Sequence, residues 1–253
     1  MSDEPVIFPP LFYEVFGNLP RQGPGGDAYT LKALSLIPNK ESIRDILDVG
    51  CGSGAPTMVL ARNTTANIVA LDNCPPFLET LQKTAQESGF DKRIRCVNGD
   101  MSKPEFAPDS FDLIWSEGAI ACVGFEQGLK IWKPLLRANG CVAVTDLCWF
   151  TENPPKEIYD YLTGFYPGMM SAAESLKAVE RAGYRLLNHF SLPKESWAME
   201  YFAPLEVEIE RQRPLHANDT KALELLDALQ FEADMYKKYS DHYGYAFFIA
   251  QKI

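Results

Sequence analysis

Residues 46–56 read ILDVGCGSGAP, an apolar run followed by three glycines that alternate with single residues. The run predicts a buried strand, and Pro56 predicts the first turn of a helix, where the N–H that proline lacks would have no partner. Glycines between a strand and a helix let a ligand approach the main chain. Because Gly50-x-Gly52-x-x-Ala55 also fits the loose dinucleotide fingerprint, the spacing alone leaves the ligand open.

Length and composition predict a soluble globular protein. The chain has 253 residues, 46% of them hydrophobic and 23% charged, so we expect one large domain, or a domain with an insertion, around a sizeable core. No stretch holds the roughly 20 apolar residues of a membrane-spanning helix, and the N-terminus MSDEPVIFPP is acidic where a secretory signal is basic. We therefore expect a cytoplasmic protein with no membrane partner.

Charge and cysteine spacing exclude two further classes. A formal net charge of −10 argues against a nucleic-acid partner, because binding to phosphates needs clustered lysine and arginine. None of the six cysteines forms C-x-x-C or lies beside a histidine at ligand spacing. We expect reduced cysteines and no metal site.

From residue 43 onward, short apolar runs alternate with amphipathic ones, which predicts an α/β fold with a parallel sheet covered by helices on both faces. Ser171-Ala-Ala-Glu174 predicts a capped helix start, and Gly89 and Gly183 predict helix ends. Strands are expected over 43–50, 67–72, 93–100, 111–119, 140–146, 184–190 and 245–253, with helices from about 56 and over 76–89, 125–132 and 171–181.

Two segments lie outside this alternation. Residues 1–42 precede the first strand, with a helix expected from about 27 to 36, and we expect this segment to cap the cofactor site. Residues 193–244 separate the last two strands and are expected to be a helical insertion. Its apolar stripe fits core packing, a lid or a dimer face, and consists of Leu223, Leu226, Leu229 and Ala233.

Acidic side chains follow four of the expected strands: Asp48, Asp72, Asp100 and Glu117. Ligands of open parallel sheets bind at the carboxyl ends of the strands, so these carboxylates line one crevice. They would repel a pyrophosphate and favour a cation with hydroxyl groups. S-adenosylmethionine fits, because its sulfonium is positive and its ribose diol suits a carboxylate such as Asp72. Asp100 is placed to accept from the adenine amino group, with Met101 against the ring.

On these residues the chain resembles the class I S-adenosylmethionine-dependent methyltransferases, and most closely the small-molecule "type 11" group that includes the quinone C-methyltransferases. The resemblance covers about residues 43–192 and the final strand. It implies a Rossmann-like, doubly wound, seven-stranded sheet, mostly parallel with its last strand antiparallel, and a core of 43–192 plus 245–253. The matching motifs are D48-VGCGS-G54, Asp72, N98-GD-M101, F111-DLI-W115 and L136-RAN-G140.

Two departures from the family pattern bear on the interpretation. The usual Pro-Gly-Gly turn reads Ala138-Asn139-Gly140, with Pro134 upstream. The fourth strand lacks the Asn/Asp-Pro-Pro-Tyr signature of enzymes that methylate amino groups of bases or glutamine, which argues against those acceptors.

The expected reaction is in-line methyl transfer to a small molecule, with S-adenosylhomocysteine as the product. The competing hypotheses are an NAD-dependent oxidoreductase and a module that binds the cofactor without turnover. The acceptor atom stays open, and the chain is expected to be a monomer or homodimer. The expected cofactor-binding residues are Asp48, Gly50, Cys51, Gly52, Gly54, Asp72, Asn73, Asp100, Met101, Ser116 and Arg21.

Catalytic residues are harder to predict, because a general base is needed only when the nucleophile must lose a proton. Glu117 is the first candidate, either as a base or as an acid that contacts the cofactor. Tyr13 is the second and fits packing equally well, while Arg21 fits a carboxylate clamp or a solvated loop. Trp149 and Phe150 follow the fifth strand and are expected to wall the substrate pocket, or to be ordinary core aromatics.

Overall fold

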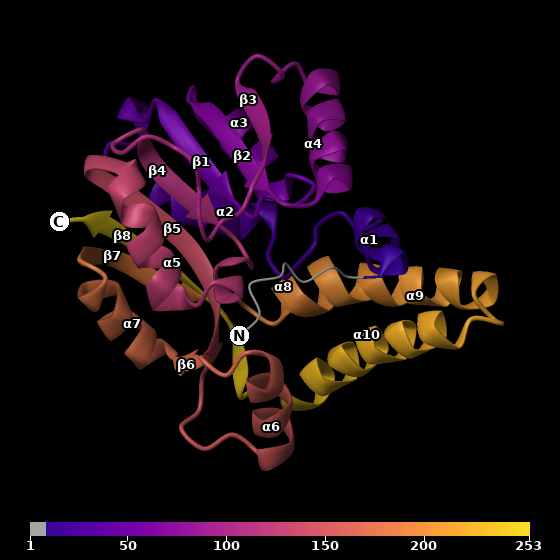
Figure 1. Cartoon of the computed structure of the whole chain (residues 1–253). Coiled ribbons are helices and arrows are strands. Elements are labelled where there is room, and N and C mark those ends of the chain that lie inside the picture. Colours follow the sequence, from indigo (N-terminus) through magenta and orange to yellow (C-terminus); the bar gives the residue numbers. More distant parts are fainter. Residues whose placement is uncertain (1–8) are drawn as a thin grey trace.

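The computed structural model describes residues 9–253, so residues 1–8 of the expected N-terminal cap lie outside the described part. A twisted sheet runs through the molecule, with helices on both faces (Figure 1). Its main path has the order β3-β2-β1-β4-β5-β8-β7. The strands are β1 Asp45–Val49, β2 Asn67–Asp72, β3 Ile94–Asn98, β4 Phe111–Ser116, β5 Leu136–Trp149, β7 Tyr184–Ser191 and β8 Tyr243–Lys252.

The sheet topology confirms the predicted fold. Strands β1 to β5 pair in parallel, and the last strand, β8, runs antiparallel between β5 and β7. The order reverses between β1 and β4, so the carboxyl ends of these two strands flank the topological switch point where ligands of open sheets bind. A short additional strand, β6 (Met170–Ser171), pairs with β5, and its two residues are too few to leave a periodic signal.

The helices divide between the two faces. Buried residues of α2 (Asp27–Ser35), α3 (Ala55–Asn63) and α4 (Pro75–Glu87) pack on one face of the sheet. Buried residues of α5 (Phe125–Trp132) and α7 (Ala172–Arg181) pack on the other. Both layers are needed because the central strands are apolar on both sides.

Local signals place several helix ends as predicted. The Ser171 hydroxyl accepts from the Glu174 N–H, and the Glu174 carboxylate accepts from the Ser171 N–H, which completes the capping box of α7. Helix α4 ends just before Gly89, whose φ of 75° is left-handed. Strand β5 begins earlier than predicted, at Leu136, because the chain from 136 to 140 stays extended apart from Asn139. Helix α6 (Lys156–Phe165) was not predicted.

The stretch before β8 is helical. It contains α8 (Glu195–Trp197), the π-helical turn η4 (Ala198–Phe202), α9 (Ala203–Leu215) and α10 (Thr220–Tyr239). Helices α9 and α10 form an antiparallel pair that projects away from the sheet, and α1 (Pro10–Gly17) packs on α9 (Figure 1). In the part of the chain from residue 9 on, no helix is both long and apolar enough to cross a membrane.

Candidate functional site

The glycine loop is shaped by close approaches between chain segments. All three glycines have positive φ values, 68° at Gly50, 54° at Gly52 and 88° at Gly54. A Cβ at Gly50 would lie 2.3 Å from the Cβ of Ala119, and a Cβ at Gly54 would lie 2.2 Å from Cδ1 of Leu81. The loop therefore needs glycine for its own packing as well as for access to the main chain.

Asp72, at the carboxyl end of β2, is oriented by the glycine loop. Its Oδ2 accepts from the Gly52 N–H at 2.8 Å, and its Oδ1 accepts from the Cys74 N–H at 2.9 Å. Burial raises its pKa, and these amide hydrogen bonds oppose that rise. Because a carboxylate oxygen accepts more than one hydrogen bond, both oxygens keep capacity for the hydroxyls of a diol.

Two buried oxygens at the switch point lack a partner among the described residues. Asp48 is buried, and its Oδ2 accepts from the Thr57 hydroxyl at 2.5 Å, whereas its Oδ1 has no donor. The hydroxyl of Ser116, at the end of the neighbouring β4, is also unpaired. Burial raises the pKa of Asp48 to about 7, and the carboxylates of Glu117 and Asp72 add to this rise. Unpaired acceptors among carboxylates fit a cationic cofactor and disfavour a phosphate.

The remaining residues of the expected cofactor set differ in exposure. Cys51 is buried, and its N–H donates to the Leu71 carbonyl at 3.1 Å. Met101 is half-buried, with its methyl group beside Gly50. Asn73 is exposed, as is Asp100, whose carboxylate accepts from the N–H and hydroxyl of Ser102. These hydrogen bonds lower the pKa of Asp100.

Arg21 and Glu117 form a buried ion pair. Nη2 of Arg21 lies 3.0 Å from Oε2 of Glu117, and their side chains are 9% and 2% exposed. The other oxygen of Glu117 accepts from the Thr30 hydroxyl at 2.6 Å and from Trp115 Nε1 at 2.9 Å. A Cβ at Gly25 would lie 2.0 Å from Nη2 of Arg21, so that glycine makes room for the arginine. Both charges predicted from the sequence are therefore in the site, and they neutralise each other.

Gln22 connects the N-terminal segment to the glycine loop. Its Oε1 accepts from both the N–H and the hydroxyl of Ser53 at 2.8 Å, and its Nε2 donates to the Phe16 carbonyl at 3.0 Å. Sequence reasoning missed this residue. The signal that could have found it is its place beside Arg21 in the motif RQGPGG.

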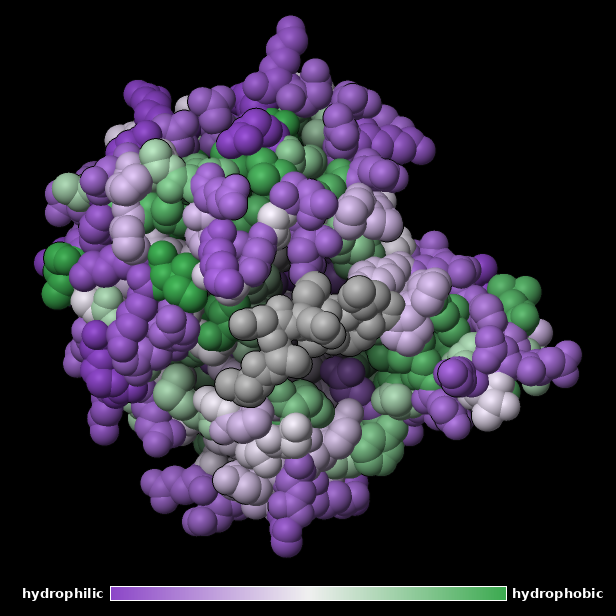
Figure 2. Space-filling view, viewed as in Figure 1, coloured by the Kyte–Doolittle hydropathy of each residue, from purple (hydrophilic) through white to green (hydrophobic). Residues whose placement is uncertain are grey.

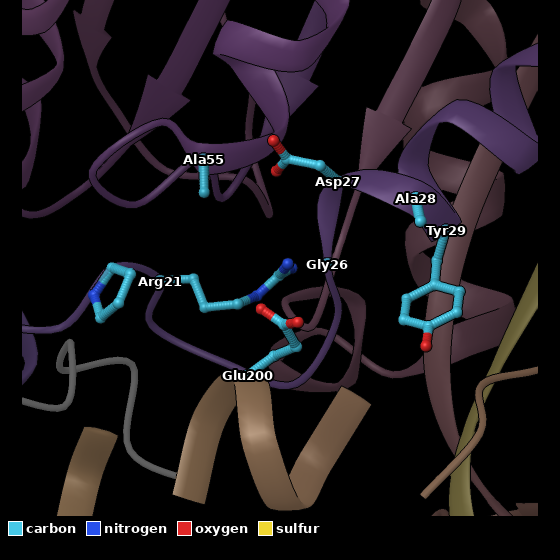
Figure 3. A pocket seen from close by; sticks show the side chains of 8 residues that line it. Arg21, Gly26, Asp27, Ala28, Tyr29, Ala55 and Glu200 are labelled. Carbon is cyan, nitrogen blue, oxygen red and sulfur yellow. The ribbon is translucent and has the colours of Figure 1, made fainter. Parts of the chain in front are cut away.

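A cavity of about 390 Å³ opens beside the glycine loop (Figure 3). It lies between Ala55 at the start of α3, the start of α2, and Glu200 in η4. The Arg21 side chain extends across it, between Asp27 and Glu200, in Figure 3.

The predicted aromatic residues lie at two separate places. Trp149 is buried and stacks on Tyr159 with ring centroids 5.7 Å apart. Phe150 is 38% exposed. Tyr13, on α1, contacts Phe77 of α4 edge-on, with centroids 6.2 Å apart.

Strand β5 also supplies a buried acid that sequence reasoning did not single out. Asp146 is buried, and its two carboxylate oxygens accept from the Tyr166 hydroxyl at 3.2 and 3.0 Å. Burial raises the pKa of Asp146 to about 7. The preceding residue, Thr145, accepts from the Gly118 N–H at 2.8 Å, so the end of β5 lies against the loop that carries Glu117.

Comparisons with known proteins agree with this geometry. Residues 46–140 match a family model described as "Methyltransferase domain". A methyltransferase of Geobacter sulfurreducens, solved with S-adenosyl-L-homocysteine, superposes with a TM-score of 0.85 at 19% identity, covering 97% of this chain and 99% of that one. The chain therefore has the fold of the class I S-adenosylmethionine-dependent methyltransferases. A similar methyltransferase of Thiobacillus denitrificans also has a TM-score of 0.85, at 17% identity over 98% of this chain and 100% of that one.

Curated relatives share part of their length with this chain. A sterol 24-C-methyltransferase of Aspergillus fumigatus is 28% identical over 179 residues, which are 66% of this chain and 46% of that protein. This chain thus spans about half the length of the curated relatives it matches. The domain match and the structural likeness confirm the predicted fold.

Proposed function

We propose that this chain transfers the methyl group of S-adenosylmethionine to a small-molecule acceptor. The observation that carries the proposal is Asp72, whose carboxylate is held beside the glycine loop by two main-chain N–H groups. S-adenosylmethionine supplies a methyl carbon activated by its sulfonium. The protein then has to align acceptor and methyl and exclude water.

The roles of the chain's own residues follow from their contacts. Asp72 would accept from the ribose hydroxyls, and the unpaired Oδ1 of Asp48 would favour the positive part of the cofactor. Glu117 accepts hydrogen bonds from three protein donors. These contacts favour a role in positioning Arg21 rather than a role in direct proton transfer. Residues 1–42 would cap the cofactor through Gln22, and residues 193–244 would cover the acceptor, above a core of 43–192 and 245–253.

The acceptor class has indirect support. The sterol in the name of the A. fumigatus relative is a small molecule. The net charge of −10 disfavours a nucleic acid as acceptor. We further propose that the protein works in the cytoplasm, as a monomer or homodimer.

Ligand titration of the full chain tests the proposal. S-adenosylhomocysteine should raise the thermal midpoint and NAD⁺ should not, because only a ligand of the folded state stabilises it by mass action. Asp72→Asn should weaken S-adenosylhomocysteine binding by roughly a hundredfold, since it removes a charge-assisted acceptor. Asp91→Asn, at an exposed turn, is the matched control. A shift with NAD⁺ alone would overturn the proposal.

Turnover needs a second measurement. Methyl-labelled S-adenosylmethionine incubated with the enzyme and a metabolite extract should yield a labelled small molecule, identified by mass spectrometry. Cofactor binding without label transfer across such extracts would favour the non-catalytic alternative.

A further inference from the structure

Glu232, on α10, is an acid that the cofactor site does not use. It is partly accessible to solvent, although the protein surrounds it so closely that burial raises its pKa to about 7. Among residues 9–253, no side chain donates a hydrogen bond or forms an ion pair with its carboxylate. A buried carboxylate without a partner is costly to the fold unless a ligand compensates it.

Four tyrosines lie close enough to Glu232 for its charge to act on their phenols. They come from α6, η4 and β8 and are Tyr161, Tyr201, Tyr243 and Tyr245. Burial raises the pKa of each phenol, and the charge of Glu232 raises it further, as expected for rings close to the carboxylate. We call Glu232 and these four residues the tyrosine–glutamate cluster.

Contacts with neighbouring aromatic rings hold the side chains of this cluster in place. Trp197 stacks on Tyr236, with centroids 4.6 Å apart, and contacts Tyr245 edge-on at 4.8 Å. The ring of Tyr161 contacts Phe231, the neighbour of Glu232, with centroids 5.3 Å apart. Figure 2 shows a hollow between the sheet and the side of the molecule that carries α6 and α10, with hydrophilic surface in its depth and hydrophobic surface around it.

Tyr245 joins the cluster to the cofactor site. Its phenol is affected by the charge of Asp146 at the end of β5 and by that of Arg21 as well as by Glu232. A Cβ at Gly118 would lie 3.4 Å from the Tyr245 ring, so this ring lies beside the loop that follows β4. The cluster therefore borders the loop that carries Glu117, at the carboxyl end of β4.

The charge of this region selects the ligand. Glu232 has no cationic partner among the described residues, and the charge of Arg21, which acts on Tyr245, is neutralised by Glu117. An anionic acceptor would be repelled, and a neutral one would leave the carboxylate uncompensated. A cation would pair with the carboxylate and contact the tyrosine rings.

We propose that the acceptor carries an ammonium group, and that the tyrosine–glutamate cluster seats this group with Glu232 as its counter-ion. This inference rests on the proposed function and adds the substrate class to it. Recognition requires no change in the methyl-transfer chemistry, because the seated group only orients the acceptor.

Matched ligands that differ in charge test the inference on the full chain saturated with S-adenosylhomocysteine. The probes are choline with its neutral isostere 3,3-dimethylbutan-1-ol, and 2-phenylethylammonium with 2-phenylethanol. Calorimetry should show at least one ammonium ion binding roughly tenfold or more tightly than its neutral counterpart. Glu232→Gln should remove most of this preference, while Glu224→Gln, at an exposed position of the same helix, should keep it.

A second pair of variants separates recognition from folding. Tyr161→Phe keeps the ring and should retain the preference, whereas Tyr161→Leu should reduce it severalfold. Equal binding of charged and neutral probes, no ammonium binding at all, or an unchanged preference in Glu232→Gln would overturn the inference. If S-adenosylhomocysteine itself fails to bind, the proposed function fails, and the same probe comparison on the ligand-free protein still decides the ammonium site.

Discussion

Arg21 and Glu117 are 96 positions apart in sequence, and their side chains meet at 3.0 Å with almost no exposure to solvent. The pair joins the N-terminal segment to the end of β4, directly beside the switch point of the sheet. Thr30 and Trp115 also donate to Glu117, so the carboxylate is held from three directions. The N-terminal segment is therefore attached to the site by a buried charge and not only by apolar packing.

Arg21→Ala should destabilise the protein strongly. It leaves the Glu117 carboxylate buried without its counter-ion, and losses of this kind are about 3–5 kcal/mol in the free energy of unfolding. Urea denaturation should show this loss, and adding Glu117→Gln should recover part of it. Arg213→Ala, which breaks the exposed pair with Asp227, should cost at most about 1 kcal/mol. Similar losses for Arg21→Ala and Arg213→Ala would contradict the buried-pair assignment.

Gln22→Ala should loosen the glycine loop without unfolding the protein. The Ser53 amide loses its acceptor, so its hydrogen exchange should accelerate. A net loss of about 1 kcal/mol corresponds to a roughly fivefold weaker binding of S-adenosylhomocysteine. Gln86→Ala, at an exposed position of α4, serves as the control and should change neither quantity. Unchanged exchange at Ser53 would show that Gln22 does not hold the loop.

The sheet could be predicted from the sequence because its signals are local. The central strands contain short apolar runs, and the acids that follow four of the strands mark the crevice without any knowledge of the fold. The first strand and the glycine loop lie within ten residues, and Asp72 lies at the end of the next strand. Periodicity and strand ends were therefore sufficient to predict the fold.

The partners within the site could not be predicted, because they join segments that are far apart in the chain. The contact of Gln22 with Ser53 and that of Tyr166 with Asp146 depend on how loops cross the sheet. Glu232 lies on a helix whose apolar stripe was visible, but the sequence does not say that the charge of this acid acts on tyrosines of β8. Only the packed structure brings these groups together.

Two glycine substitutions should have effects of opposite sign. Gly54→Ala places a Cβ within 2.2 Å of Leu81 in a left-handed conformation, so we expect a loss of about 3 kcal/mol or more in unfolding free energy. Gly164→Ala, in α6, meets no atom within 4 Å and should stabilise by about 0.5–1 kcal/mol. Leu81→Ala combined with Gly54→Ala should recover only part of the loss, because the backbone strain remains. Equal effects in chemical denaturation would refute the packing role of the loop.

The stability of the ligand-free protein should fall as the pH rises from about 5.5 to about 8. Burial raises the folded-state pKa of Asp146 to about 7, against an unfolded value near 4, so folding favours its protonated form. That contribution is complete below the unfolded pKa and is lost as the pH rises through about 7; it amounts to about 4 kcal/mol at most. The groups that face Asp146 are Tyr166, Cys148 and Tyr245, and none of them supplies a positive charge to hold the anion.

Asp146→Asn should therefore reduce the dependence of the thermal midpoint on pH, leaving the part due to Asp48 and Glu232, and should raise the midpoint above that of the wild type at about pH 8. The substituted amide keeps an oxygen that can accept from the Tyr166 hydroxyl, so the variant retains this contact. Asp234→Asn, on the exposed face of α10, should leave the slope unchanged. A wild-type midpoint that rises with pH in this window, or an equal slope in Asp146→Asn, would show that the carboxyl group is ionised in the folded protein, and its burial would then have to be compensated by a cation.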